Sequence, residues 1–236
     1  MKSTNIILIL GKRGTGKSYF AQRFVIKYPR FLVYDPLFQH GSIGKVCTSL
    51  EELTFTGNDN IVFQPISDNV EKFDEFCKKI WDSNEHNFVL MIEEITSYIE
   101  FNLPEYFGRL VRMGRNRGIG IIGISQRPKK LGGTFPALVD DWFIFKFDFP
   151  ADVDFLKQYI GEENSERIKN LPQYEYLHYD SYNCYWHKPI GDNNSSHQPK
   201  TSQESQDQHN QQEKQSQKMS QQQSQQESQS SSTPSN

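Results

Sequence analysis

Apolar and polar residues follow one another in short blocks along the first 190 residues. The continuous apolar runs, which are typical of buried parallel strands, are 5–10, 31–34, 60–64, 87–92, 119–125 and 142–147. Apolar residues at helical spacing predict helices at 17–28, 70–81, 104–113 and 152–160. Two further runs, 174–179 and 182–187, predict a β-hairpin. This alternation predicts an α/β fold in which helices cover both faces of a parallel-core sheet, followed by the C-terminal β-hairpin.

The composition changes at residue 191. Gln and Ser fill 26 of the 46 positions in 191–236, and Met219 is the only hydrophobic residue there. Such a segment buries too little apolar surface to offset the entropy lost on ordering. We therefore expect a compact domain at 1–190 and a disordered Gln/Ser-rich tail at 191–236.

Charge and hydropathy exclude several classes of protein. The formal net charge is −3, which argues against a wholly basic nucleic-acid coat and leaves local basic patches open. No apolar run approaches the roughly 18 to 20 residues that cross a bilayer, so we expect no transmembrane segment. Cys47, Cys77 and Cys184 are odd in number and far apart, as expected of reduced thiols, and we predict a cytoplasmic location.

The strongest chemical signal is the segment GKRGTGKS, which fits the pattern G-x-x-x-x-G-K-[ST] between a predicted strand and a predicted helix. Glycines allow backbone N–H groups to turn inward around a polyphosphate, and the helix N-terminus adds partial positive charge. We expect Lys17 to reach the β- and γ-phosphates of ATP and Ser18 to offer its hydroxyl to Mg²⁺. The flanking strand and helix argue against a chance match in a glycine-containing turn. The predicted nucleotide-binding residues are Gly11, Lys12, Arg13, Gly14, Thr15, Gly16, Lys17 and Ser18.

Polar residues also end two of the other predicted strands. Glu93 and Glu94 follow 87–92, and adjacent carboxylates repel each other unless a cation lies near. We assign Glu93 to Mg²⁺ and Glu94 to the general base that activates water. Gln126 follows 119–125, where an amide can sense the γ-phosphate and place the water. The alternatives are an acidic helix start for the glutamates and a hydrogen-bonding loop residue for Gln126.

Two basic clusters and an aromatic group each allow more than one interpretation. Arg109, Arg112, Arg115 and Arg117 lie within nine positions, and Arg127, Lys129 and Lys130 form a second patch. One arginine could act as a finger in a neighbouring subunit's ATP site, while others could grip DNA phosphates. A solvated basic surface is the alternative. The aromatic residues of the hairpin could stack on bases, but their alternation favours cross-strand packing.

Together, the segments GKRGTGKS, FVLMIEE and RNRGIGIIGISQRP resemble the HerA–FtsK superfamily of P-loop ATPases over roughly residues 5–187. The resemblance implies a RecA/FtsK-like P-loop NTPase fold and a homo-oligomeric ring, usually a hexamer, that translocates double-stranded DNA. It also implies that Glu93 and Glu94 are the Walker B pair, Gln126 the sensor, and Arg115 or Arg117 the finger acting in trans. Many relatives carry Asp where Glu93 stands, although HerA-like members use Glu-Glu.

The short single-domain form is similar to the genome-packaging ATPases of tailless icosahedral viruses with internal membranes. This likeness implies an ATP-hydrolysing DNA translocase that fills a preformed capsid with the viral genome. A motor for plasmid mobilisation or DNA processing remains an alternative, as does a non-translocating ATPase switch for virion or pilus assembly. The tail at 191–236 has no usable counterpart in the family, and contact with capsid or membrane proteins is one role open to it.

Overall fold

The computed structural model describes residues 2–55, 59–100, 102–132 and 134–189. The tail predicted at 191–236 lies outside the described residues. Among the residues that are described, no helix combines the length and the apolar composition needed to cross a bilayer.

One mostly parallel sheet organises the described residues, with the strand order β3-β4-β2-β5-β6-β1-β7-β8-β9. The central strands are buried along their whole length, which explains their continuous apolar sequences. Only β8 and β9 run antiparallel to their neighbours. The predicted α/β fold with a parallel core and a C-terminal hairpin is confirmed. The strands are β1 (Ile6–Leu10), β2 (Phe31–Tyr34), β3 (Lys45–Cys47), β4 (Ile61–Phe63), β5 (Phe88–Ile92), β6 (Ile119–Ser125), β7 (Asp141–Ile144), β8 (Tyr176–Tyr179) and β9 (Cys184–His187).

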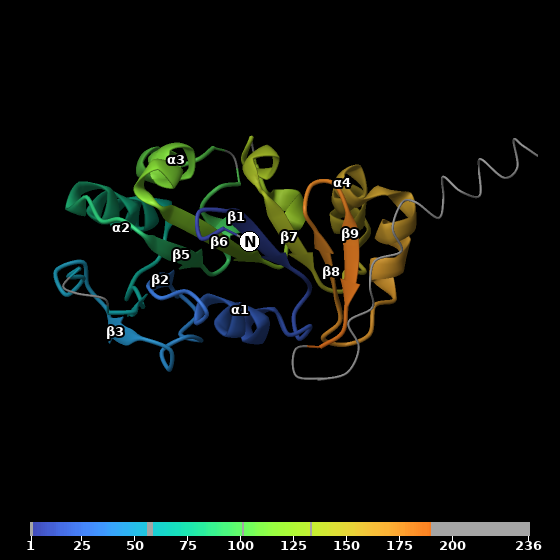
Figure 1. The fold of residues 1–236 in the computed structure, drawn as a ribbon, viewed down its shortest axis with the longest axis horizontal. Helices are drawn as coiled ribbons and strands as arrows, with labels where there is room; N and C mark the ends of the chain where they lie inside the picture. Colours follow the sequence, from blue (N-terminus) through green and yellow to red (C-terminus); the bar gives the residue numbers. More distant parts are fainter. Residues whose placement is uncertain (1, 56–58, 101, 133, 190–236) are drawn as a thin grey trace, which may run out of the picture. The chain divides into compact units, whose positions relative to one another are not determined.

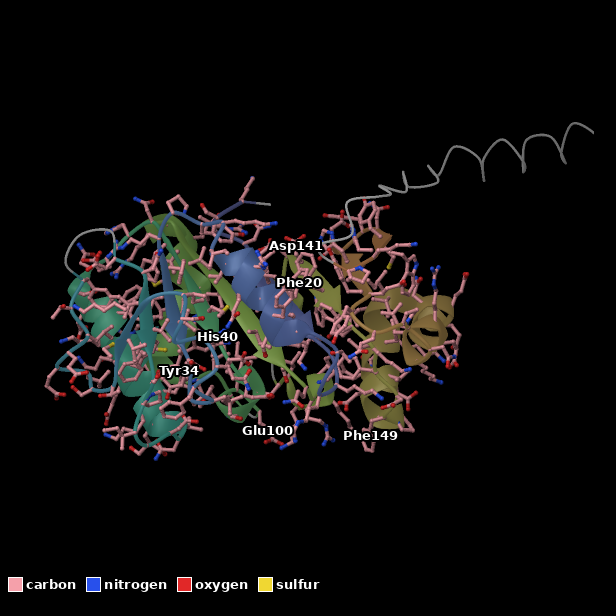
Figure 2. All side chains as sticks on the ribbon, turned by 90° about the horizontal axis from the view of Figure 1, so that it is seen from below. Phe20, Tyr34, His40, Glu100, Asp141 and Phe149 are labelled. Atoms are coloured by element: carbon pink, nitrogen blue, oxygen red, sulfur yellow. The ribbon has the colours of Figure 1, made fainter. Side chains whose placement is uncertain are left out.

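Helices cover both faces of this sheet (Figure 1). On one face lies α1 (Lys17–Val25), whose Phe20 packs 5.0 Å from the ring of Phe143 and 4.8 Å from that of Tyr176 (Figure 2). The opposite face carries α2 (Val70–Ser83), α3 (Glu105–Met113) and α4 (Pro150–Lys169). Because successive side chains of a strand point to opposite faces, β1 contributes residues to both cores.

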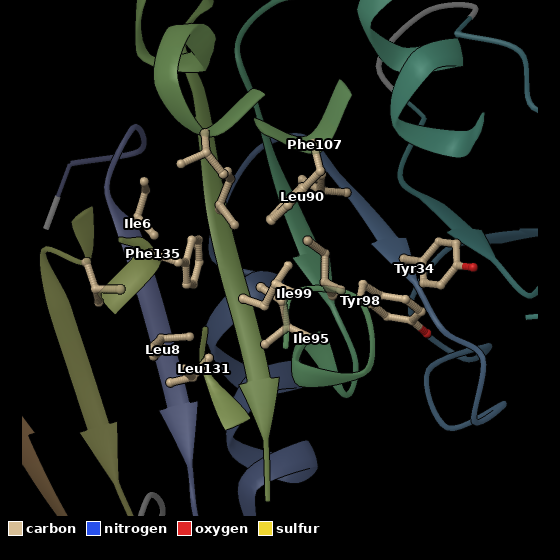
Figure 3. Close-up of a cluster of buried hydrophobic side chains, with 14 of the residues drawn as sticks. Ile6, Leu8, Tyr34, Leu90, Ile95, Tyr98, Ile99, Phe107, Leu131 and Phe135 are labelled. Carbon is tan, nitrogen blue, oxygen red and sulfur yellow. The ribbon is translucent and has the colours of Figure 1, made fainter. Parts of the chain in front are cut away.

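The larger core fixes the segment that follows β5. Ile95 and Ile99 are fully buried in it (Figure 3), and the ring of Tyr98 stacks 4.3 Å from that of Phe73. The hydroxyls of Tyr34 and Tyr98 both donate to the carboxylate of Asp68, at 2.7 and 2.8 Å. Burial and these hydrogen bonds raise the pKa of both tyrosines. The chain is therefore anchored immediately after the Glu93-Glu94 pair.

Several elements differ from the predictions, as three examples show. The short strand β3 was not predicted, because two of its three residues are exposed and leave no apolar run. β7 ends at Ile144, although Phe145 continues along β1 by donating its N–H to the Leu10 carbonyl at 2.7 Å. α4 extends to Lys169 through a break at Gly161, where φ is 78°, and a polar sequence hides its second half.

Candidate active site

The predicted nucleotide-binding loop, the Glu93-Glu94 pair and Gln126 meet at one edge of the sheet, whereas the two predicted finger arginines do not lie there. Residues 11–18 follow β1, Gln126 follows β6, and the Glu93-Glu94 pair follows β5. Because β6 lies between β1 and β5, Gln126 stands between the glycine-rich loop and the two carboxylates. The Gly11 N–H donates to the Ser125 carbonyl at 3.3 Å and joins the first two strand ends. Ligands of open α/β sheets bind at this edge, outside the carboxyl ends of the strands.

Three glycines determine the shape of the loop. Gly14 and Gly16 have φ values of 80° and 97°, a left-handed conformation that glycine adopts without strain. A Cβ on Gly11 would lie 2.6 Å from the Cβ of Phe145. The Thr15 hydroxyl closes the turn by donating to the Lys12 carbonyl at 2.8 Å. α1 then begins without a side-chain cap, which leaves its first N–H groups for a ligand or for water.

A cavity of about 490 Å³ opens beside this loop. Most of the predicted loop residues line it, as does Gln126. Of the remaining predicted loop residues, Thr15 is buried and Lys12 forms an ion pair with Asp148. The sequence did not point to three further lining residues, which are Tyr19, Leu37 and Gln39.

Lys17 lies at the floor of the site with only 7% of its surface exposed. Its ammonium group donates to the Lys12 carbonyl at 3.0 Å. Burial lowers the pKa of Lys17, and the negative charges of Glu94 and Glu93 act in the opposite direction. A buried cation held by a neutral carbonyl is a ready partner for an anion.

Glu93 is held by a buried histidine that sequence reasoning missed. His40 Nε2 lies 2.6 Å from Glu93 Oε1, and the two side chains are 0% and 2% exposed. The backbone N–H of His40 donates to Asp35, which also accepts from Gln64, each at 2.8 Å. Among the described residues, His40 Nδ1 has no hydrogen-bond partner. One signal in the sequence could have pointed to this region. Asp35 follows β2 as Glu93 follows the neighbouring strand β5, so the chain just after Asp35, which includes His40, could be expected near Glu93.

Glu94 adopts a backbone conformation that is rare for its residue type. Its φ and ψ are both 46°, in the left-handed region, and Gln126 Nε2 donates to its Oε1. Such conformations persist where the surrounding structure over-determines them, and they cluster at functional sites. The buried side chains of Ile95, Tyr98 and Ile99, which follow directly, supply that constraint here. The carboxylate and the amide, predicted as base and sensor, are therefore in direct contact.

Arg115 and Arg117 lie at the opposite edge of the sheet, before β6 begins. The seven residues of β6 separate them from Gln126 by about 20 Å, so neither reaches the loop of its own chain. Arg115 pairs with Asp140 at 3.2 Å. The guanidinium of Arg117 lies 3.7 Å from the ring of Trp81 and donates to the Trp81 carbonyl at 2.9 Å.

Several of the remaining basic residues have acidic partners. In the first cluster, Arg109 pairs with Glu105 at 2.7 Å. In the second, Arg127 pairs with Asp152 at 3.2 Å and Lys130 with Glu100 at 3.1 Å. These pairs reduce the local positive potential.

The strand order and the loop after β1 define the fold of a P-loop NTPase. Solved structures with this fold include the genome packaging NTPase B204 from Sulfolobus turreted icosahedral virus 2. Its complex with AMPPCP has a TM-score of 0.68 and 23% identity, and its complex with ATP-gammaS has a TM-score of 0.70 and 22% identity. Each match covers 80% of this chain and 100% of that one. VirB4 of Thermoanaerobacter pseudethanolicus matches with a TM-score of 0.61 and 11% identity, over 82% of this chain and 91% of that one.

The resemblance predicted from the motifs is thereby confirmed for the fold. No protein-family model matches the sequence, and no curated protein sequence matches it.

Proposed function

We propose that this chain is an ATP-hydrolysing motor that translocates double-stranded DNA and packages a viral genome into a preformed capsid. The observation that carries the proposal is the meeting of three side chains from different parts of the sheet: Lys17 and Gln126 line one cavity, and Gln126 donates to Glu94. Lys17 begins the helix after β1, while Gln126 and Glu94 follow β6 and β5. The likeness of the fold to a genome packaging NTPase over that protein's full length supports the biological setting.

The chain's own residues fit the chemistry of phosphoryl transfer. Lys17 would exchange its carbonyl partner for the β- and γ-phosphates, which are stronger acceptors. Glu94 would accept a proton from the attacking water, which the amide of Gln126 orients. The Ser18 hydroxyl and the Glu93 carboxylate are hard oxygen donors of the type that Mg²⁺ prefers. Bound there, Mg²⁺ would supply positive charge to the phosphate oxygens.

The placement of the arginines supports a ring of identical subunits. Arg115 and Arg117 are separated from Gln126 by the length of β6, about 20 Å, so a role at the phosphates requires a neighbouring subunit. An arginine inserted in trans stabilises the charge that develops in phosphoryl transfer. Sequence-independent contacts with DNA phosphates would transmit the resulting movement to DNA.

A second candidate function is a motor for plasmid transfer. The likeness of the fold to the pCW3 conjugation coupling protein TcpA favours it, with a TM-score of 0.52 and 16% identity over 78% of this chain and 59% of that one. Both motors share one reaction, and the genes that surround this one distinguish them. Capsid genes support packaging, whereas relaxase genes support plasmid transfer.

ATP hydrolysis by the full chain, measured with and without double-stranded DNA, tests the motor. We expect DNA to stimulate the rate, and the stimulation to fall steeply with salt because counterions compete for the phosphates. Lys17→Ala is expected to abolish both the basal and the stimulated rates. An ATP hydrolysis rate that is the same with and without DNA would support an assembly switch. A hydrolysis rate in Lys17→Ala equal to that of the wild type would refute the assigned site.

A further inference from the structure

A second cavity, of about 410 Å³, lies beside the 490 Å³ cavity at the glycine-rich loop. The two cavities share Gly16 and Tyr19 in their linings, so they lie next to each other at the start of α1. Its lining differs in kind, because four of its six residues are aromatic and none is charged. We call this second cavity the aromatic pocket; its lining is Gly16, Tyr19, Phe20, Phe145, Tyr174 and Pro189.

The aromatic pocket has a rigid floor and open walls. Phe20 and Phe145 are 4% and 1% exposed, and their ring centroids lie 5.5 Å apart in an edge-on arrangement. Tyr19 and Tyr174 are 54% and 49% exposed. Two half-exposed aromatic side chains above a buried apolar floor favour a flat, apolar-faced occupant over a charged one.

Tyr174 is fixed against the phosphate-binding loop. Its φ is 67°, a value that is a genuine outlier for a bulky residue. A Cβ on Gly16 would lie 2.6 Å from its ring, so the ring packs directly on the last glycine of the loop. The preceding residue, Gln173, donates to the Gly14 carbonyl at 3.3 Å. The strained backbone therefore presents an aromatic face beside the phosphate site, where strain commonly accompanies a ligand clamp.

We infer that the aromatic pocket binds the base of the nucleotide whose phosphates occupy the loop. This inference rests on the proposed function and specifies the substrate of the same site. Stacking on an aromatic side chain is available to every base, and the larger purine ring system gains most from it. The only polar side-chain atoms of the lining are tyrosine hydroxyls, so the exocyclic groups that distinguish adenine from guanine are not read. The chain consequently prefers purine over pyrimidine nucleotides and accepts ATP and GTP almost equally.

Binding of ATP and of inorganic tripolyphosphate to the full chain with Mg²⁺, followed by calorimetry, tests the inference. Tyr174→Asn removes the ring while keeping a residue that tolerates the left-handed backbone, and Tyr174→Phe keeps the ring. We expect Tyr174→Asn to weaken ATP binding about tenfold and to leave tripolyphosphate binding unchanged. Tyr174→Phe should bind both ligands as the wild type does. Tyr182→Ala, at a tyrosine that is 90% exposed and outside the pocket, is the matched control and should change neither affinity.

Several results would overturn the inference. For the wild type, they are an affinity for ATP no higher than that for tripolyphosphate, or an affinity for CTP equal to that for ATP. In Tyr174→Asn, they are an unchanged ATP affinity or an equal loss for both ligands. Failure of the proposed function looks different, because a wild-type chain that binds neither ATP nor tripolyphosphate has no phosphate site at all.

Discussion

The His40–Glu93 pair gives the most quantitative prediction for this site. His40→Leu replaces the imidazole with an apolar side chain and leaves the Glu93 carboxylate buried without its 2.6 Å partner. His40 Nδ1 has no partner among the described residues, so the substitution removes a single side-chain hydrogen bond. The result therefore reports on the pair alone.

The expected loss follows from burial. Breaking a buried pair by removing one partner costs about 3 to 5 kcal/mol, because the remaining charge is uncompensated. The side chains of His40 and Glu93 are 0% and 2% exposed, so solvent screens the remaining charge only weakly. We therefore expect His40→Leu to lower the free energy of unfolding by about 3 kcal/mol.

Urea unfolding followed by tryptophan fluorescence measures this loss as a shift of the midpoint. His86→Leu makes the same replacement at an exposed histidine and should change the unfolding free energy by less than about 0.5 kcal/mol. The double variant His40→Leu/Glu93→Gln removes the stranded charge and should be more stable than His40→Leu alone. A loss below about 1 kcal/mol, or a double variant no more stable than the single one, would refute the reasoning.

Three further predictions concern the loop and the hairpin side of the sheet. Burial lowers the pKa of Lys17 in the folded chain below its ordinary value of 10.5. The unfolded chain therefore binds a proton at Lys17 more tightly than the folded chain does, and the charged lysine destabilises the folded state at neutral pH. Lys17→Met should therefore raise the melting temperature without nucleotide while abolishing the rise that ATP produces; a lower melting temperature would contradict this. Gly16→Ala places a Cβ at φ 97° and 2.6 Å from Tyr174, and should cost at least about 1 kcal/mol in urea unfolding, whereas a neutral effect would contradict the loop geometry. Burial opposes ionisation of Asp141, but hydrogen bonds from His178 and Asn5 outweigh it and lower the pKa. Its contribution to stability is present above about pH 3.8 and is lost as pH falls through the lower folded value. Asp141→Asn should flatten the fall of the urea midpoint below about pH 4, and an unchanged slope would count against this pair.

The sequence predicted the parts of the site that depend on chain order. The loop at residues 11–18, the Glu93-Glu94 pair and Gln126 each follow a continuous apolar run, and parallel strands bring such positions to one edge. The contact between Gln126 and Glu94 arises because β6 lies between β1 and β5, which local patterns do not specify.

The missed residues depend on contacts between distant segments. His40 lies in a loop with no periodic pattern, and its importance appears only when Glu93 lies 2.6 Å away. Tyr174 was assigned to a strand because it continues an aromatic alternation, yet β8 begins at Tyr176. Its positive φ and its contact with Gly16 come from tertiary packing that overrides local preference. β3 was missed for the related reason that an exposed edge strand carries little apolar signal.

The central claim is that this site hydrolyses a nucleoside triphosphate with Glu94 as the base. Glu94→Gln keeps the size of the side chain and its contact with Gln126 but removes the proton acceptor. We predict that this variant binds ATP with wild-type affinity while its kcat falls by about 10² or more. A Glu94→Gln chain that hydrolyses ATP at the wild-type rate would contradict the account.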